Sequence, residues 1–296
     1  MAGIGDRKIV AVLGARGMLG TDLSALLAEA GFDVAASDLP ECDVTNPAHL
    51  EAALAGADCA VNCAAYTNVD RAEDEPDLAR AVNAVAVAEM GRIAARRGLY
   101  LVHVSTDFVF DGESERPYVE TDLPNPLGVY GATKLEGERA LAACGCRHAV
   151  VRVQWSYGRH GSNFVSKLLD RARTGAALKV VDDQVGAPTW TLDSARAILC
   201  LLRARAAGIF HFAAAGYASR FDVARFVLDR LRLPNALAPC SSAEFPARAR
   251  RPSSSRFDTA RIRPLLDHPI RPWQDAMAEF LAGMSCALRS GPGAAR

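Results

Sequence analysis

Short apolar runs alternate with amphipathic segments through the first half of the chain. The apolar runs, rich in small and branched side chains, lie at 8–13, 32–37, 58–62, 99–105 and 148–153. Apolar residues with helical spacing separate them, first at Leu19, Leu23, Leu26 and Leu27, and then at 47–55, 76–97 and 127–143. Near-continuous apolar strands that alternate with helices are typical of a parallel sheet covered on both faces. The pattern predicts an α/β fold, a Rossmann-type doubly wound parallel sheet.

The regular alternation ends after Trp155. Helical patterns continue at 163–174, 191–205, 221–232 and 275–288, and 235–255, rich in Pro, Ser and Ala, is predicted to be loop. We predict a first domain at 1–153, whose sheet is completed by segments near 178–213, in particular 178–181 and 209–212. A smaller, mixed domain is predicted from 154–177 and 214–290, with a disordered tail at 291–296.

A glycine-rich turn follows the first predicted strand. Gly14, Gly17 and Gly20 are spaced GxxGxxG where a strand is expected to end and a helix to begin. The first glycine permits a tight turn, the second lets the backbone approach a pyrophosphate, and the third lets the helix pack on the sheet. The N–H groups of the helix N-terminus, around Met18 and Leu19, suit phosphates. The turn predicts an NAD(P)-binding domain at 1–153, with an ordinary glycine-rich turn as the alternative.

Asp38 ends the second predicted strand, about 20 residues after the glycine turn. A carboxylate at this place can bind the adenosine ribose hydroxyls and repels a 2′-phosphate, and no Arg follows immediately. We therefore predict NADH or NADPH as the cofactor, with NADH slightly favoured. The alternative is that Asp38 only forms the turn before Pro40.

Polar residues suited to carbonyl reduction follow the fourth predicted strand. Ser105, Thr106 and Asp107 come at its end, and ligands of open α/β sheets bind at such strand ends. Tyr130 and Lys134 are four residues apart on the next predicted helix, so that their side chains share one face. A polar turn and a surface Tyr–Lys pair are the alternative interpretations.

The chemistry of a reduced carbonyl favours an active site. Hydride transfer leaves an alkoxide that needs a proton, and Tyr130 can supply it. The ammonium of Lys134 is expected to lower the Tyr130 pKa from its ordinary value of about 10. Thr106 can donate a hydrogen bond to the same oxygen. The sequence therefore predicts Tyr130, Lys134 and Thr106 as catalytic residues.

Taken together, these motifs resemble the extended short-chain dehydrogenase/reductases, and within them the dTDP-4-dehydrorhamnose reductase family. The similarity extends over nearly the whole chain. Its specific segments are 62–73 (NCAAYTNVDRAE), 105–112 (STDFVFDG), 124–138 (PNPLGVYGATKLEGE), 151–155 (VRVQW), Asn163-Phe164, 183–189 (DQVGAPT), and Arg251-Pro252 before Ser255-Arg256. The resemblance implies NAD(P)H-dependent reduction of the 4-keto group of dTDP-4-dehydro-6-deoxy-L-mannose to dTDP-L-rhamnose.

The resemblance also implies individual roles. Tyr130 would be the proton donor, Lys134 its electrostatic partner and ribose ligand, and Thr106 would orient the keto oxygen. Asp107 and Trp155 would face the sugar nucleotide, with a place in the core as the alternative for Trp155. Besides the residues of the glycine turn, those implied to line the cofactor are Asp43, Val44, Ala64, Ala65 and Thr67.

Asn83 and the pair Asp183-Gln184 each match a position of the family, and each also has a purely structural alternative. Asn83 matches an Asn that supports the catalytic Lys in the wider superfamily, but it could equally make a local contact within its helix. Asp183-Gln184 belongs to a segment that the family shares, but it could equally form a turn.

Three positions depart from the family pattern. Ser254 replaces the usual Asn, which puts base or sugar contacts there in doubt. Some members hold Mg²⁺ with acids at a subunit interface; Asp22 matches one such acid but Leu192 replaces another, so we predict no metal. Gln154 replaces the small hydroxyl residue that usually precedes the Trp. Either a different sugar substrate or packing within the protein would explain this difference.

The composition and charge pattern of the chain limit which binding partners and which cellular compartment are expected. Among 296 residues the 34 basic and 34 acidic side chains balance, and there is no basic block, so nucleic-acid binding is not expected. No apolar run reaches the length of about 18 residues that a membrane span needs, and residues 1–7 lack the apolar part of a signal peptide. The eight cysteines lack metal-ligand spacing, which favours free thiols in a cytoplasmic protein. A homodimer is left open.

Two other functions are left open. The first is reduction of another NDP-4-keto-6-deoxysugar in deoxysugar or antibiotic biosynthesis, because the orientation of the pyranose ring decides which alcohol forms. The second is a non-catalytic NADP-binding regulatory subunit, as in the β-subunit of methionine adenosyltransferase, which resembles this family. The intact set of Thr106, Tyr130 and Lys134 argues against the second.

Overall fold

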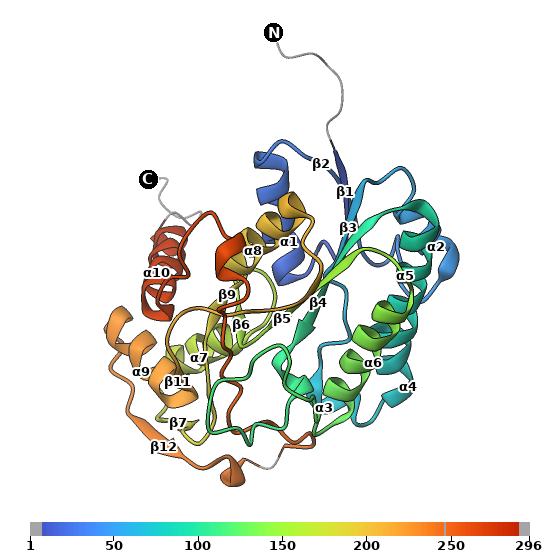
Figure 1. Ribbon diagram of the computed structural model, residues 1–296. Helices are drawn as coiled ribbons and strands as arrows, with labels where there is room; N and C mark the ends of the chain where they lie inside the picture. Colours follow the sequence, from blue (N-terminus) through green and yellow to red (C-terminus); the bar gives the residue numbers. More distant parts are fainter. Residues whose placement is uncertain (1–7, 246, 290–296) are drawn as a thin grey trace.

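A six-stranded parallel sheet forms the centre of the computed structural model, which describes residues 8–245 and 247–289 (Figure 1). Its strands, in the order β10-β5-β4-β3-β1-β2, are Gly208–Phe212, His148–Val153, Tyr100–Thr106, Cys59–Asn62, Ile9–Leu13 and Asp33–Ser37. All five pairings are parallel. The side chains of 10–13 in β1 are fully buried, which explains the continuous apolar run. The predicted Rossmann-type fold is confirmed.

Helices cover both faces of this sheet (Figure 1). One apolar core packs α1 (Met18–Glu29) and α8 (Thr191–Ala204) against one face. A second core packs α2 (Pro47–Ala53), α5 (Ala86–Arg97) and α6 (Val129–Ala143) against the other. The long helix predicted at 76–97 has three parts: α4 (Pro76–Arg80), a π-helical turn (Ala81–Val85) and α5, which ends at Gly98 with a positive φ of 67°. A short helix, α3 (Val69–Ala72), precedes them.

The chain beyond β5 adds a third apolar core. It is formed by α7 (Phe164–Arg173), α9 (Arg220–Leu231), α10 (Trp273–Arg289) and the short strands around them. These strands form three two-stranded sheets: β7 (Leu178–Val181) with β12 (Leu237–Cys240), β6 (Ser156–Tyr157) with β9 (Thr189–Trp190), and β8 (Val185–Gly186) with β11 (Ala218–Ser219).

Two sequence predictions about this region are wrong. Residues 178–181 do not join the central sheet, because β7 pairs with β12 instead. Residues 235–255, predicted as loop, contain β12 and a 3₁₀ turn at 242–244. The carboxylate of Asp183 accepts N–H and O–H groups of Ser241 and Ser242, which favours the turn interpretation of Asp183.

The prediction that residues 209–212 complete the central sheet is confirmed, because β10 pairs with β5.

The division into two domains remains a prediction. The predicted tail at 291–296 and the first seven residues lie outside the described residues. Within the described part of the chain, no helix has the length and apolar character needed to cross a membrane. The seven cysteines described there are free thiols.

Candidate active site

The turn between β1 and α1 is shaped by its glycines. Gly14 has a positive φ of 75°, and a Cβ there would lie 2.5 Å from the backbone nitrogen of Ala64. A Cβ on Gly20 would lie 2.1 Å from the carbonyl oxygen of Gly14, so the third glycine lets α1 pack on the turn. Gly17 is the N-cap of α1, with no side-chain cap and no acid in the first turn. The N–H groups of that turn therefore fit the phosphates of a dinucleotide.

Asp38 both shapes a turn and borders the same site. Its Oδ2 accepts the backbone N–H of Arg16 at 2.7 Å, and its Oδ1 accepts that of Leu39 at 2.8 Å. The Arg16 guanidinium donates to the carbonyl oxygen of Leu39 and forms an ion pair with Glu41 at 2.9 Å. Arg16 is thus a cation beside Asp38 that the sequence analysis missed, because its position depends on the contact between the two turns.

The segment after β3 forms the next part of the wall. Its backbone is held by Asn83, whose Oδ1 accepts the Tyr66 N–H at 2.9 Å. The Asn83 amide also donates to the carbonyl oxygen of Tyr66 and to the Thr133 hydroxyl, both at 3.2 Å. Asn83 therefore holds this segment against α6, whereas the hydrogen bonds of Lys134 go to other groups.

Thr106, Tyr130 and Lys134 converge at the C-terminal end of β4. Thr106 is the last residue of β4, and its hydroxyl accepts the Phe108 N–H at 3.2 Å. Tyr130 and Lys134 lie one turn apart on α6, and both line the same cleft as Thr106. A Cβ on Gly131 would lie 2.1 Å from the carbonyl oxygen of Phe108, so glycine lets α6 pack directly against the turn after β4.

Burial dominates the ionisation of both α6 side chains. It raises the pKa of Tyr130 to about 12, although the neighbouring Thr106 hydroxyl acts in the opposite direction. It lowers the pKa of Lys134, which is 1% exposed, to about 8. The predicted lowering of the Tyr130 pKa by Lys134 is therefore wrong for this structure. A phenol with a high pKa is nevertheless in the correct form to donate a proton to an alkoxide.

Asp107, Trp155 and Arg220 form a polar and aromatic part of the wall. Asp107 is 2% exposed, its Oδ2 has no hydrogen-bond partner among the described residues, and burial raises its pKa to about 6. Trp155 has a positive φ of 45°, and the guanidinium carbon of Arg220 lies 3.6 Å from the centre of its ring. Burial lowers the pKa of Arg220 to about 10. Trp155 borders the cleft and also packs against the third apolar core, so its position agrees with both interpretations.

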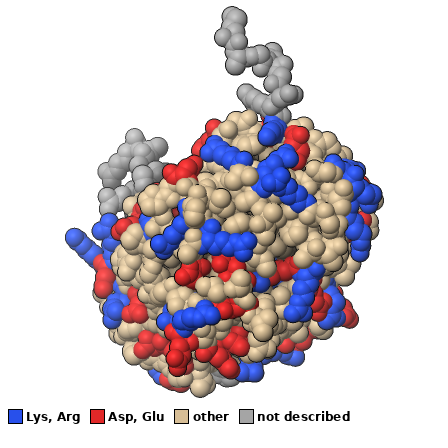
Figure 2. Space-filling view, viewed as in Figure 1, with Lys and Arg blue, Asp and Glu red and all other residues tan. Residues whose placement is uncertain are grey.

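One cleft of about 1800 Å³ connects these groups. It is lined by all the predicted site residues: Gly14, Gly17, Met18, Leu19, Asp38, Asp43, Val44, Ala64, Ala65, Thr67, Thr106, Asp107, Tyr130, Lys134 and Trp155. Its volume exceeds the roughly 300–1,000 Å³ of pockets for one small ligand. The cationic lining residues that sequence reasoning missed are Arg16, Lys167, Arg171, Lys179, Arg220 and Arg250. Figure 2 shows basic and acidic side chains interspersed over the visible face.

Asp22, which matches the family pattern, and two residues that depart from it have structural contacts. Asp22 Oδ2 accepts the Thr191 hydroxyl at 2.5 Å. The side-chain oxygen of Gln154 accepts the Ala187 N–H at 2.8 Å, which favours packing as the reason for this glutamine. The Ser254 hydroxyl accepts a hydrogen bond at 2.9 Å from an arginine side chain two residues further on.

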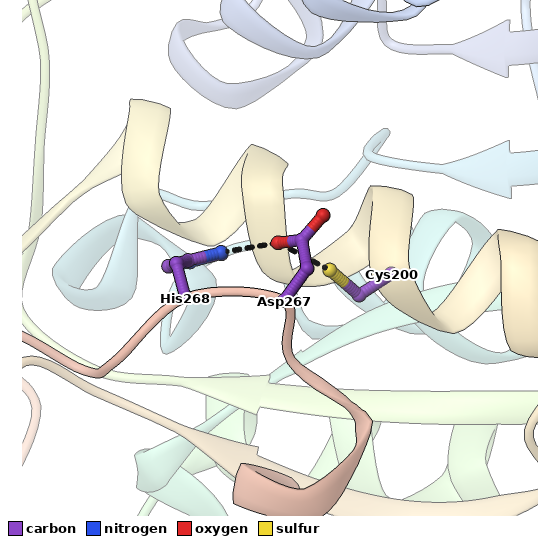
Figure 3. A group of neighbouring side chains, drawn as sticks. All are labelled: Cys200, Asp267 and His268. Atoms are coloured by element: carbon purple, nitrogen blue, oxygen red, sulfur yellow. Dashed lines mark hydrogen bonds and ion pairs between the residues drawn. The ribbon is translucent and has the colours of Figure 1, made fainter.

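Away from the cleft, the described side chains include one group of metal-ligand types, Cys200, Asp267 and His268 (Figure 3). Asp267 Oδ1 accepts hydrogen bonds from His268 Nδ1 at 2.6 Å and from Cys200 Sγ at 3.3 Å. Asp267 Oδ2 lies 3.5 Å from the Arg203 guanidinium. Protein donors already satisfy this carboxylate, so the group links α8 to the loop at 267–268 through hydrogen bonds.

The fold and this cleft define the class as a nicotinamide-dependent reductase of the short-chain dehydrogenase/reductase type. Comparison with known proteins narrows the class. The family model described as RmlD substrate binding domain matches residues 7–286, and the chain belongs to this family. The resemblance seen in the sequence is confirmed.

Individual relatives agree with the family. The chain is 41% identical over 289 residues to the dTDP-4-dehydrorhamnose reductase of Mycobacterium tuberculosis H37Rv, covering 95% of this chain and 94% of that one. It is also 41% identical over 275 residues to a probable dTDP-4,6-dihydroxy-2-methyloxan-3-one 4-ketoreductase of Streptomyces antibioticus, covering 90% and 92%. The crystal structure of dTDP-4-dehydrorhamnose reductase from Bacillus anthracis in complex with NADP matches with a TM-score of 0.90 and 30% identity, covering 94% and 100%.

Proposed function

We propose that this protein reduces the 4-keto group of dTDP-4-dehydro-6-deoxy-L-mannose to dTDP-L-rhamnose with NADH or NADPH. The observation that carries the proposal is the convergence of Thr106, Tyr130 and Lys134 on the wall of one cleft that also reaches the glycine turn. Relatives at 41% identity that are named as reductases of dTDP-linked keto sugars support the substrate class.

In the proposed reaction, Tyr130 donates its hydroxyl proton to the oxygen at C4 of the sugar as that oxygen gains negative charge. Its high pKa keeps the phenol protonated at neutral pH, so the acid is ready before the reaction begins. Thr106 donates a hydrogen bond to the same oxygen. When bound, the reduced nicotinamide supplies the hydride that adds to C4. The positive charge of Lys134 stabilises the phenolate that Tyr130 becomes once it has donated its proton.

The sugar nucleotide is assigned to the part of the cleft that is lined by Asp107, Trp155 and Arg220. Asp107 can accept hydrogen bonds from sugar hydroxyls, because its buried Oδ2 has no partner among the described residues. Trp155 offers an aromatic face. Arg220 and Arg250 supply positive charge for a diphosphate, whereas Arg251 forms an ion pair with Asp70 at 2.7 Å.

The cofactor is assigned to the glycine turn and the wall beside it. Asp38 disfavours a 2′-phosphate and the neighbouring Arg16 favours one, so we propose that the protein uses both NADH and NADPH. Asp38→Ala should raise KM for NADH more than for NADPH, and Arg16→Ala should do the reverse. Initial rates with both cofactors measure the two ratios. Unchanged ratios in both variants would contradict these assignments.

A second candidate is reduction of a different dTDP-4-keto-6-deoxysugar. The Streptomyces antibioticus relative, named as a 4-ketoreductase of another dTDP-sugar, is as similar to this chain as the M. tuberculosis relative. The site residues do not separate the two, since both reactions need the same acid and hydride.

One experiment distinguishes these candidates. The purified protein is incubated with NADPH or NADH and a panel of dTDP-4-keto-6-deoxyhexoses, and the products are assigned by NMR. Formation of dTDP-L-rhamnose at the highest kcat/KM supports the proposal. A faster reaction with another sugar supports the second candidate, and no oxidation of NAD(P)H with any panel member would contradict both. Tyr130→Phe is the control for a contaminating reductase.

A further inference from the structure

Three fully buried polar residues form a row that ends at the lysine of the proposed active site. We name this row of Asn62, His103 and Lys134 the lysine network. Asn62 and His103 are paired across β3 and β4, and the three residues are at most 1% exposed. His103 Nδ1 lies 3.0 Å from Asn62 Nδ2, and His103 Nε2 lies 3.4 Å from Lys134 Nζ. None of the roles proposed above uses Asn62 or His103.

Hydrogen-bonding rules fix the direction of this row. The backbone N–H of Ala64 can only donate, and it lies 3.0 Å from Asn62 Oδ1. The NH₂ group of Asn62 therefore faces His103 and donates to Nδ1. Burial and the charge of Lys134 lower the pKa of His103 well below its usual value, so the ring is neutral. A neutral histidine that accepts at Nδ1 carries its proton at Nε2, and this N–H points toward Lys134.

An N–H group directed at Lys134 affects the charge of the lysine. An ammonium group has three N–H donors and no lone pair, whereas a neutral amine can accept one hydrogen bond. One donor of Lys134 is already used by the carbonyl oxygen of Val104 at 2.7 Å. The row therefore holds the Lys134 nitrogen in place and favours its uncharged form over the ammonium.

We propose that Asn62 and His103 are positioning residues that fix the direction of the Lys134 side chain and set its charge state. The consequence for turnover rests on the proposed function, in which Lys134 assists Tyr130. The protonation states of His103 and Lys134 can be measured without any turnover, so the two proposals can fail separately.

Other ionisable groups around the lysine network also shift the pKa values of Lys134 and His103. Glu138 on α6 raises the pKa of Lys134, against the larger effect of burial. Cys63, after β3, would act in the same direction as a thiolate, but burial raises its own pKa to about 12 and keeps it neutral. His148 on β5 lowers the pKa of His103. A substitution confined to Asn62 leaves all of these groups in place.

The first test uses the unmodified protein. The chain has six histidines, and their ring nitrogens can be followed by ¹⁵N NMR after histidine labelling. Loss of one signal set in His103→Gln assigns the residue. We expect His103 to be neutral and protonated at Nε2 between about pH 5 and 9. A proton at Nδ1 would overturn the proposal without any functional assay.

The second test reverses the hydrogen bonds. In Asn62→Asp, the new carboxylate accepts from Ala64 and also from His103, so the histidine proton must move to Nδ1. Nε2 then accepts a hydrogen bond from the Lys134 ammonium, which stabilises the charged form. In the unmodified protein, Lys134 is charged below about pH 8 and neutral above it. In the variant the charge should persist to higher pH, by about one unit or more.

The pH at which Lys134 loses its charge and the alkaline limb of the kcat profile should shift together in Asn62→Asp. The chain has four lysines, so NMR of protein labelled with [ε-¹³C]lysine can follow Lys134, with Lys134→Met for assignment. The alkaline limb of the kcat profile with a 4-keto sugar nucleotide should shift by the same amount. The control is Asn62→Asp in a His103→Gln background, which retains the field of the added carboxylate. We expect less than half of the shift there; an equal shift in both backgrounds, or none in either, would overturn the proposal.

Discussion

A second buried polar network lies beside the lysine network, and comparison of the two separates a structural arrangement from a catalytic one. We name it the arginine network; its members are Ser105, Glu138, Arg152 and His211. The strand register places Ser105 opposite Arg152 and Arg152 opposite His211, across β4, β5 and β10. Glu138 Oε1 accepts from Ser105 at 2.5 Å, and the carboxylate accepts from Arg152 at 3.0 and 2.6 Å. The network therefore ties three strands to α6.

The arginine network is complete in both charge and hydrogen bonds. The carboxylate of Glu138 balances the guanidinium of Arg152, and both side chains are almost fully buried. Arg152 Nη1 donates to His211 Nε2 at 3.3 Å, so His211 Nδ1–H donates to the carbonyl oxygen of Tyr118 at 3.0 Å. Burial lowers the pKa of His211 to about 3, which keeps the ring neutral.

The lysine network is incomplete in both respects. Among the described residues, the hydrogen-bonding neighbours of Lys134 are the carbonyl oxygen of Val104 and the ring of His103, and neither carries a negative charge. Both networks are deeply buried, and each reaches the cleft through one residue, Lys134 or Ser105. The Ser105 hydroxyl already donates to Glu138, whereas Lys134 retains donor capacity toward the cleft. Damage to the arginine network should therefore cost stability, and damage around Lys134 should cost turnover.

The largest expected effect is on turnover, in Tyr130→Phe. Removal of the hydroxyl removes the proposed acid, so kcat should fall by about 10²–10⁴. The ring contact with Phe108, with centroids 5.4 Å apart, is retained, so the melting temperature should change little. Steady-state kinetics and calorimetry on the same preparation measure both quantities. Turnover close to that of the unmodified protein would remove Tyr130 from the mechanism.

The next effect is on stability, in Glu138→Gln. The substitution leaves the buried charge of Arg152 without a counter-ion, which should cost about 3–5 kcal/mol of the free energy of unfolding. Denaturant titration gives this value. The matched control adds Arg152→Met, which removes the second charge and should restore part of the loss. If Glu138→Gln alone costs under about 1 kcal/mol, the ion pair is not the structural link that the geometry indicates.

The Thr106→Val substitution should affect both stability and turnover, because Thr106 is adjacent to Ser105 of the arginine network and borders the cleft. Loss of its hydrogen bond to the developing alkoxide should lower kcat by about 10–10²-fold, or roughly 1.4–2.7 kcal/mol. The hydroxyl also caps the 3₁₀ turn at 107–109, and loss of such a cap costs about 0.5–2 kcal/mol. A melting shift of a few degrees should therefore accompany the kinetic loss. A melting shift with unchanged turnover per folded molecule would make Thr106 a structural residue only.

The sequence predicts those parts of the fold and site that depend on local spacing. The central strands are buried on both faces, so each reads as an apolar run, and GxxGxxG and the Tyr130–Lys134 spacing are local motifs. The β7–β12 pair was missed because its second strand contains Pro239, which reads as loop. That pair has only two strands, so a proline that cannot donate to a ladder is tolerated there.

Other parts of the site depend on contacts between distant segments. Arg220 begins α9 after a two-residue strand, and nothing in its local sequence indicates that it stacks on Trp155. His103 reads as an interruption in an apolar strand, and its role depends on the register that places Asn62 beside it. The pKa of Tyr130 was predicted wrongly from spacing, because burial, which spacing does not reveal, is the largest cause of its shift.

The smallest expected effect is in Ser105→Ala, which tests whether the arginine network is structural throughout. The substitution removes one hydrogen bond to the Glu138 carboxylate, while both bonds from Arg152 remain. The free energy of unfolding should fall by about 1.5–2 kcal/mol, the lower end of the usual range for one bond to a charged group, because Arg152 still donates to the carboxylate. At about 2–4 °C per kcal/mol, the melting temperature should fall by a few degrees. Turnover should stay within about twofold, because the bonds of Lys134 to Val104 and His103 are unaffected. A loss of turnover comparable to that of Thr106→Val, with an unchanged melting temperature, would show that Ser105 acts on the reaction and that the two networks are not separate.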